Sequence, residues 1–440
     1  MLVIELNEFS ADLLRKIAGR ENLTFLQEVL QWHQDRSWSE DTYDSGFLEP
    51  WVQWVSVHSG VPSTTHQIKN LGDIPSLSAK QIWEKWSDKG QSSVIWGVMN
   101  GSRGTADKCH AFIPDPWTFS ENAYPSEYTS LIELPRYLAK NYLDISKRKV
   151  ALSGSKLLAS MIRHTSSRDF LDAMRFLVQG LKQFGPAHIV FIVFFEYLSA
   201  MAFLRATKRF QPDHAILFLN TLAHTQHHYW LSRDGHSCPQ LAFAAKAINE
   251  ILTKVFQKAP PSLGEKKCVM NALSQTCTLD EPAWILHRPH NPASFIELLG
   301  IKPISIEPLM THDAHLHFST QERTQEAYDI LRSVEINGKP MLHVEKNLTD
   351  SRVLFYRLDF FNPVDDSTVF QHNGTQSRFK EHFASIVKRT GKHIPEGTVL
   401  TNWEAFDRSI YNHEILETLT EQDKKSSASA LKSRQEERDN

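Results

Sequence analysis

Short apolar runs alternate along this chain with segments of helical spacing, and this alternation constrains the fold more than any other feature. The runs that indicate buried strands are Leu2–Leu6, Ser92–Val98, Ala215–Leu219 and Lys267–Met270. Helix-like segments such as Ala11–Ile17 and Ser78–Lys89 lie between them. Strands that alternate with helices favour a mainly parallel sheet covered by helices. We therefore predict an α/β fold with three layers, α/β/α.

Length, charge and cysteine content indicate a globular protein with a large core and argue against a nucleic-acid binder or a zinc ribbon. A chain of 440 residues that is 41% hydrophobic can bury a large core without metal or disulfide support. Lys and Arg number 48 against 51 Asp and Glu, which argues against a nucleic-acid binder that works by neutralising phosphates. The four cysteines are scattered without a C-x-x-C pair, so we expect buried thiols and no zinc ribbon.

One apolar segment, residues 189–204, raises the question of a membrane span. Glu196 lies in its middle, and a carboxylate at the centre of a bilayer costs about 2.5–3.5 kcal/mol. A buried helix is therefore the better interpretation. The first residues, Met1–Leu6, lack the basic region and the long apolar stretch of a signal peptide. We expect a cytoplasmic protein with no membrane partner.

The chain is interpreted as one α/β domain over residues 1–423. Between residues 141 and 210 it becomes helical and basic, which indicates a helical insertion over the sheet. Val353–Leu358 is predicted to be a strand and Glu381–Arg389 a helix. The last segment, residues 424–440, is charged and almost free of large apolar side chains, so we expect disorder there.

Three histidines, His224, His227 and His228, follow the strand Ala215–Leu219. Parallel sheets bind ligands at the carboxyl ends of their strands, and neutral imidazole is a good ligand for zinc. On a helix His224 shares a face with both of the others. The alternative is that all three are packing or surface groups.

Other polar turns lie where a site in such a sheet would be. Asn7 and Glu8 follow the first strand, and Glu49 precedes a tryptophan-bearing helix. The N-terminus of that helix would direct its N–H groups at an anion, although the spacing alone favours a tryptophan-rich core helix followed by a turn. His393 lies in a loop flanked by Gly391 and Gly397.

In their order along the chain these segments resemble the alkaline phosphatase superfamily, specifically its type I phosphodiesterase/nucleotide pyrophosphatase-like branch. Asn7 stands where the family's first strand ends in a metal-binding Asp. The stretch that ends the family's nucleophile helix resembles Ser59–Pro62 with His66–Ile68. The family's Asp-x-x-x-His motif resembles Ala223–Trp230, with His227 as the histidine, and its late Gly-Thr-His loop resembles Gly391–Gly397. The resemblance covers most of residues 1–405.

The active-site motifs diverge from the family pattern. The nucleophilic Thr or Ser falls on Pro50, the Asp of the Asp-x-x-x-His motif falls on Ala223, and the Asp-His-Gly motif falls in Asn271–Ser274. Two ions that stabilise both the attacking and the leaving oxygen need carboxylate ligands, which are mostly missing here. Glu8 and Glu49 could serve as a ligand or as a general base.

The resemblance implies a divergent metal-assisted hydrolase of a phosphate ester, phosphodiester or sulfate ester, with a small molecule or a glycan as substrate. We predict that His224, His227 and His393 bind a divalent metal ion, zinc by preference. Asn7 would donate to an anionic oxygen of the substrate, and Glu49 would be the general base. The alternative is a non-catalytic member that binds a phosphorylated or sulfated sugar or nucleotide.

Overall fold

The computed structural model describes the chain except for residues 43–46, 142, 310–311, 348–349, 407 and 423–440. The described residues form two compact units. The first contains Met1–Pro135, Arg148–Leu279 and the chain from Gly391, and the second contains Arg136–Lys147 and Asp280–Thr390. That residues 1–423 form one domain stays a prediction. The tail for which we expected disorder lies outside the described residues.

The first unit is built on an eight-stranded sheet. In spatial order its strands are β20 (Ile410–Tyr411), β2 (His33–Trp38), β19 (Glu396–Thr401), β6 (Lys267–Met270), β1 (Leu2–Leu6), β5 (His214–Leu219), β3 (Ser93–Val98) and β4 (Cys109–Pro114). All neighbouring pairs are parallel except the two that involve β19. The four apolar runs predicted to be strands are all present in this sheet, because short runs with few polar side chains require burial on both faces.

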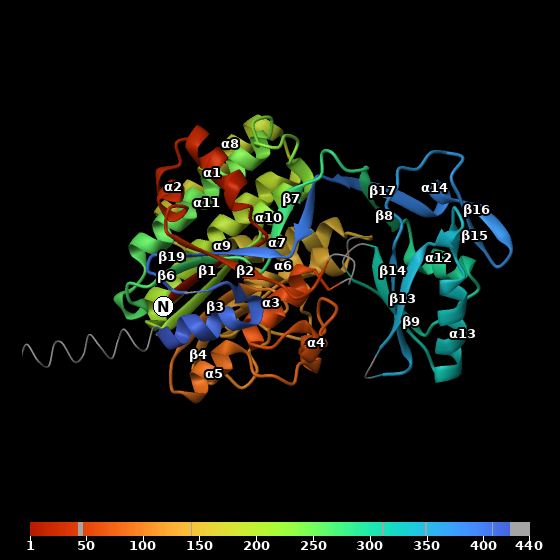
Figure 1. Ribbon diagram of the computed structural model, residues 1–440, viewed down its shortest axis with the longest axis horizontal. Helices are drawn as coiled ribbons and strands as arrows, with labels where there is room; N and C mark the ends of the chain where they lie inside the picture. The colour runs from red at the N-terminus through yellow and green to blue at the C-terminus, as the bar shows by residue number, and fades with distance from the viewer. Residues whose placement is uncertain (43–46, 142, 310–311, 348–349, 407, 423–440) are drawn as a thin grey trace, which may run out of the picture. The chain divides into compact units, whose positions relative to one another are not determined.

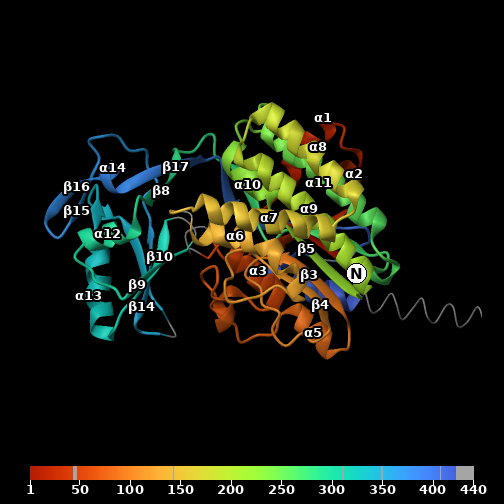
Figure 2. The same cartoon turned by 180° about the vertical axis from the view of Figure 1, so that it is seen from behind.

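Helices cover both faces of the sheet (Figures 1 and 2). On one face lie α1 (Ala11–Arg20), α9 (His188–Phe210), α10 (Thr221–Tyr229) and α11 (Pro239–Lys258), and on the other lie α3 (Pro50–Ser59) and α5 (Ile82–Asp88). Three further described helices lie before residue 141 in the sequence: α2 (Thr24–Val29), α4 (Ser63–His66) and α6 (Thr129–Lys140). Trp54, Trp83 and Trp96 are fully buried between the layers. The predicted α/β fold with a mainly parallel central sheet is confirmed.

The segment predicted to be helical and basic forms α7 (Lys147–His164), α8 (Ser167–Phe184) and α9. Among the described helices, α9 is the one long and apolar enough to cross a membrane, with a mean hydropathy of 1.9 in its most apolar window. That window is 67% buried within the protein. Glu196 of α9 accepts hydrogen bonds from the backbone N–H groups of Asn220 and Thr221. In the structure α9 is therefore a core helix.

The second unit is mostly antiparallel. One sheet has the order β13 (Leu342–Lys346), β14 (Val353–Leu358), β10 (Asp313–His317) and β9 (Ser305–Pro308), and another has β12 (Lys339–Pro340), β11 (Glu335–Ile336), β15 (Val369–His372) and β16 (Thr375–Arg378). Its helices are α12 (Pro292–Leu298), α13 (Gln321–Arg332) and α14 (Phe379–His382). The predicted helix Glu381–Arg389 is wrong, because residues 383–389 form strand β17 (Phe383–Arg389) against β8 (Trp284–Pro289). Pairing with β8 satisfies the backbone of this segment, so the tertiary partner overrides its local pattern.

Candidate metal centre

The carboxyl ends of β1 and β5 bring the first polar turn of the site into place. Leu6 pairs in register with Leu219, so the residues that follow, Asn7 and Asn220, lie side by side. The amide nitrogen of Asn7 donates to Asn220 Oδ1 at 2.8 Å and to Glu8 Oε1 at 2.9 Å, and Trp54 Nε1 donates to Asn7 Oδ1 at 2.7 Å. Both amide N–H groups of Asn7 therefore have protein partners. Asn7 holds the turn, and it has no N–H left for the predicted contact with a substrate.

Glu8 is the centre of the site. Its backbone is left-handed, with φ of 53°, a conformation that costs a residue with a side chain about 1–3 kcal/mol. The turn is held in this shape in part by Gln226, which donates to the carbonyl of Glu8 at 2.8 Å. The carboxylate is 3% exposed. Its Oε2 lies 2.9 Å from His227 Nε2 and 3.0 Å from His393 Nε2, and the two Nε2 atoms are 3.3 Å apart. We call Glu8, His227 and His393 the Glu8 cluster.

Backbone carbonyls orient both imidazoles of the Glu8 cluster. His227 on α10 places Nδ1 3.2 Å from the carbonyl of Gly391, and His393 places Nδ1 3.1 Å from the carbonyl of Leu48. These partners hold one proton of each ring on Nδ1, so Nε2 is the atom that faces Glu8 and that a metal ion would bind. Metal-binding histidines in proteins are held in this way, by a carbonyl or carboxylate behind the ring.

A second strand pair positions His393. It lies on β18 (Gly391–Ile394), which pairs antiparallel with β7 (Ser274–Cys277) so that His393 is opposite Gln275. The side-chain nitrogen of Gln275 donates to Glu8 Oε2 and, at 3.2 Å, to the carbonyl of Ala223. Gln275 thus connects three segments of the site. Gln275 is not among the residues predicted from the sequence, because its only sequence signal is its place shortly after β6.

Glu49 lies on the outer side of His393. It is the N-cap residue of α3, and its Oε2 is 3.3 Å from His393 Nδ1. The side chains of Glu49 and His227 are 22% and 15% exposed, whereas those of Glu8 and His393 are 3% exposed. Solvent therefore reaches the site past Glu49 and His227. Pro50 is the first residue of α3 and presents no hydroxyl there.

The charges of the Glu8 cluster are strongly coupled. Burial alone would raise the pKa of Glu8, but the positive charges of His393 and His227 hold it well below its usual range. Burial would lower the pKa of His393, but the carboxylates of Glu8 and Glu49 raise it. A proton on His393 therefore balances the carboxylates, and a divalent cation bound to the same atoms would displace that proton.

The donor set fits one divalent ion. Two imidazole nitrogens and one carboxylate oxygen are a common ligand set for zinc, and three protein ligands leave a position open for water or substrate. Within the described residues, the Glu8 cluster is the one group of three His, Cys, Asp or Glu side chains close enough to share an ion. The two-ion centre that the superfamily resemblance implies does not fit these residues.

His224, the third ligand predicted from the sequence, lies elsewhere. Its ring centroid is 4.4 Å from that of His228 and 5.0 Å from that of His188. Burial, together with His228 and His188, holds the pKa of His224 well below its usual value. The spacing on α10 allowed His224 to pair with either His227 or His228, and in the structure it pairs with His228. The third donor beside His227 and His393 is therefore Glu8 and not His224.

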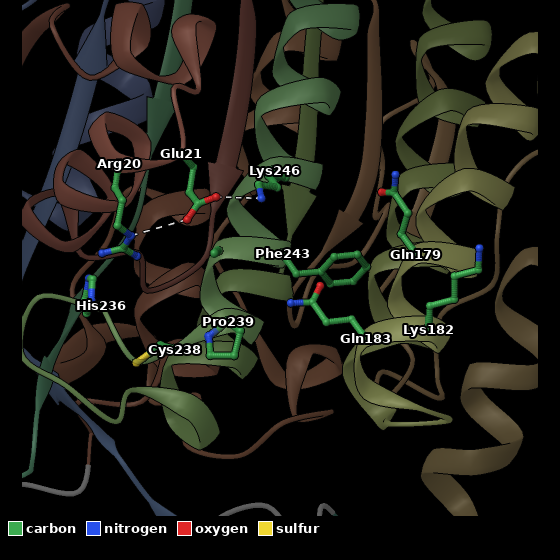
Figure 3. Close-up of a pocket in the computed structure, with 11 residues that line it drawn as sticks. Arg20, Glu21, Gln179, Lys182, Gln183, His236, Cys238, Pro239, Phe243 and Lys246 are labelled. Carbon is green, nitrogen blue, oxygen red and sulfur yellow. Dashed lines mark ion pairs between the residues drawn. The ribbon is translucent and has the colours of Figure 1, made fainter.

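A cavity of about 610 Å³ lies among α1, α8 and α11, apart from the Glu8 cluster. Figure 3 shows Glu21 between Arg20 and Lys246, to which it is joined at 3.5 Å and 2.7 Å. Lys182 of α8 lines the opposite side, and Phe243 of α11 lies between. Since Glu21 offsets two of these cations and no residue of the Glu8 cluster lines the cavity, we do not assign the site chemistry to it.

No protein-family model and no curated protein matches this sequence. Solved structures do match. Phosphonoacetate hydrolase from Sinorhizobium meliloti is 12% identical, with 95% of this chain and 94% of that chain covered and a TM-score of 0.44. Murine ectonucleotide pyrophosphatase/phosphodiesterase 5 is 12% identical, with 96% and 93% covered and a TM-score of 0.42. Wild-type alkaline phosphatase PafA is 9% identical, with 94% of each chain covered and a TM-score of 0.46. At these identities and TM-scores, the function has to be inferred from the residues of this chain.

Proposed function

We propose that this chain is a metal-assisted hydrolase that acts on the phosphate ester or phosphodiester bond of a small molecule. The observation that carries the proposal is the Glu8 cluster, in which two Nε2 atoms and one Oε2 atom lie 2.9–3.3 Å from one another. A divalent ion bound there would supply Lewis-acid polarisation of a phosphoryl oxygen. Zinc is the preferred ion, because imidazole dominates the donor set.

The residues around the cluster support direct attack by water. Pro50 stands where the resemblance places a hydroxyl nucleophile, so no ester to the enzyme can form at that position. Glu49 is partly exposed and borders the open side of the site, where its carboxylate can accept a proton from a water molecule. Gln275 and Asn7 act as positioning residues, since both donate to the Glu8 carboxylate.

A non-catalytic binder of a phosphorylated or sulfated sugar or nucleotide is the second candidate. The observations that favour it are the missing hydroxyl at Pro50 and the commitment of both Asn7 N–H groups to protein partners. Such a protein would keep the metal and the anion affinity but not the turnover. For either function, we propose that the protein is cytoplasmic.

The experiment starts from metal-free protein to which zinc, manganese or magnesium is added separately. The substrates are an aryl phosphate monoester, an aryl phosphodiester and an aryl sulfate, and the variants are His227→Ala and its neighbour His228→Ala. We expect metal-dependent hydrolysis of a phosphate substrate that is lost in His227→Ala and kept in His228→Ala. Stoichiometric metal binding without turnover would favour the non-catalytic binder. Absence of metal binding by the wild-type chain would exclude both candidates.

A further inference from the structure

The outward faces of α7 and α8 expose large apolar side chains. Six residues on these two helices are 39–66% exposed: Leu152, Leu158, Ile162, Leu171, Val178 and Leu181. Single exposed apolar residues are normal on a soluble protein, but contiguous groups of them mark interaction sites. The two helices follow one another in sequence and lie in the helical layer with α9 (Figure 2).

On each helix the exposed apolar residues form one stripe. At 100° per residue, Leu152, Leu158 and Ile162 fall within about a third of the circumference of α7. The residues on the opposite side of α7, among them Leu157 and Met161, are buried. On α8 the stripe is likewise opposite the buried Ala173, Phe176 and Gly180. Both stripes therefore point away from the body of the first unit.

Basic residues run beside both stripes at intervals of seven. On α7 they are Lys149, Lys156 and Arg163, and on α8 they are Arg168, Arg175 and Lys182. Since seven residues are close to two helical turns, each set stays on one side of its helix. With Arg148, residues 148–184 hold seven Lys and Arg against two Asp, a net charge of +5 in a chain whose total is −3.

The acidic residues of these helices do not neutralise the outward face. Asp169 and Asp172 both pair with Lys254 of α11, at 2.8 Å and 2.5 Å. Two of the basic residues have carboxylate partners from other helices, since Lys156 lies 3.4 Å from Glu133 and Arg175 lies 3.1 Å from Glu250. Both of these pairs are exposed on the basic side, where solvent screening makes them weak.

We propose that the α7–α8 face docks on the surface of a bilayer that contains anionic phospholipids. Leu, Ile and Val beside Lys and Arg are the composition of helices that lie in the membrane interface, with the apolar side chains among the acyl chains and the cations at the head groups. A second copy of this chain fits less well, because two such faces would bring like charges together. The proposal departs from our sequence-based expectation of no membrane partner. It does not depend on the proposed hydrolase activity, and it leaves α9 inside the protein.

The test is co-sedimentation of the full chain with phosphatidylcholine vesicles that contain or lack phosphatidylserine, at low and at high salt. The variants are Ile162→Gln/Leu171→Gln, which removes apolar contacts, and Arg163→Glu/Arg168→Glu, which reverses charge. Leu231→Gln is the control, since Leu231 is a large apolar residue that is 52% exposed outside this face. Thermal unfolding of each variant verifies that it folds.

We expect the wild-type chain and Leu231→Gln to bind the anionic vesicles, with binding weakened by salt and at least about tenfold weaker for each double variant. Equal binding to both kinds of vesicle, or no binding to either, would overturn the proposal. So would a dimer in size-exclusion chromatography that Ile162→Gln/Leu171→Gln abolishes, because the face would then serve a second copy.

Discussion

Replacement of Glu8 by glutamine tests whether Glu8 is a metal ligand or only the buried ion-pair partner of His227 and His393. Glutamine keeps the shape of the side chain and a carbonyl oxygen that can accept from Asn7 or Gln275. It removes the only negative charge among the three donor atoms of the Glu8 cluster. Loss of a residue that merely supports a metal ligand lowers metal affinity by about 10–100-fold. We expect loss of the ligand itself to reach at least the upper end of that range.

The expected change in the free energy of unfolding follows from the linkage between metal binding and folding. At a zinc concentration of about 100 times the wild-type dissociation constant, bound metal raises the free energy of unfolding by about 2.7 kcal/mol. An affinity about 100-fold weaker leaves only about 0.4 kcal/mol at the same concentration. The difference of about 2.3 kcal/mol is large enough to be resolved in a denaturant titration.

The assay is urea-induced unfolding of the wild-type chain, of Glu8→Gln and of Glu28→Gln, each with and without zinc. Glu28 is an exposed carboxylate on α2 and serves as the matched control. We expect zinc to stabilise the wild-type chain and Glu28→Gln equally and Glu8→Gln hardly at all. A full zinc-induced gain in Glu8→Gln would refute the assignment of Glu8 as a ligand, whatever the stability of the variant without metal.

Three further predictions concern the structure that supports the site. His58→Leu should lower the free energy of unfolding in urea by about 3–5 kcal/mol. His58 Nε2 lies 2.8 Å from Glu5 Oε1, both side chains are 0% exposed, and the substitution leaves the buried Glu5 carboxylate without this partner. A loss below about 1 kcal/mol would contradict the prediction. Gly391→Ala should weaken zinc binding, because the added Cβ would lie 2.1 Å from Gln275 Oε1 and 3.0 Å from the carbonyl of Gln226. Calorimetry measures the affinity, and an unchanged value would contradict the prediction by showing that β18 can shift without disturbing the ligands. Burial raises the pKa of Glu196 from 4.5 to about 7, so its protonated form favours the folded state: that stability is fully present below pH 4.5 and is lost as the pH rises through about 7. Glu196→Gln should therefore show a smaller fall in stability with rising pH over this window, and equal slopes for variant and wild type would disprove the assignment.

The sheet and the approximate place of the site follow from local sequence. Four apolar runs had to be buried strands because they are too short for helices and carry too few polar groups for the surface. The polar turns after them must then meet at one edge of a parallel sheet. This reasoning places Asn7 and the segment of His227 beside each other, and it brings His393 and Glu49 to the same edge through the resemblance.

Which atoms meet was decided by the tertiary structure. Helical spacing on α10 allowed His224 to pair with either His227 or His228. In the structure His227 contacts Gly391, Glu8 and His393, and His224 pairs with His228. The left-handed backbone of Glu8 has no local sequence signal, since it is sustained by contacts with residues more than 200 positions away. Periodicity in a sequence says which faces are apolar, because that depends on neighbouring residues. Which polar group becomes a ligand depends on distances across the sheet, and only the folded chain defines those distances.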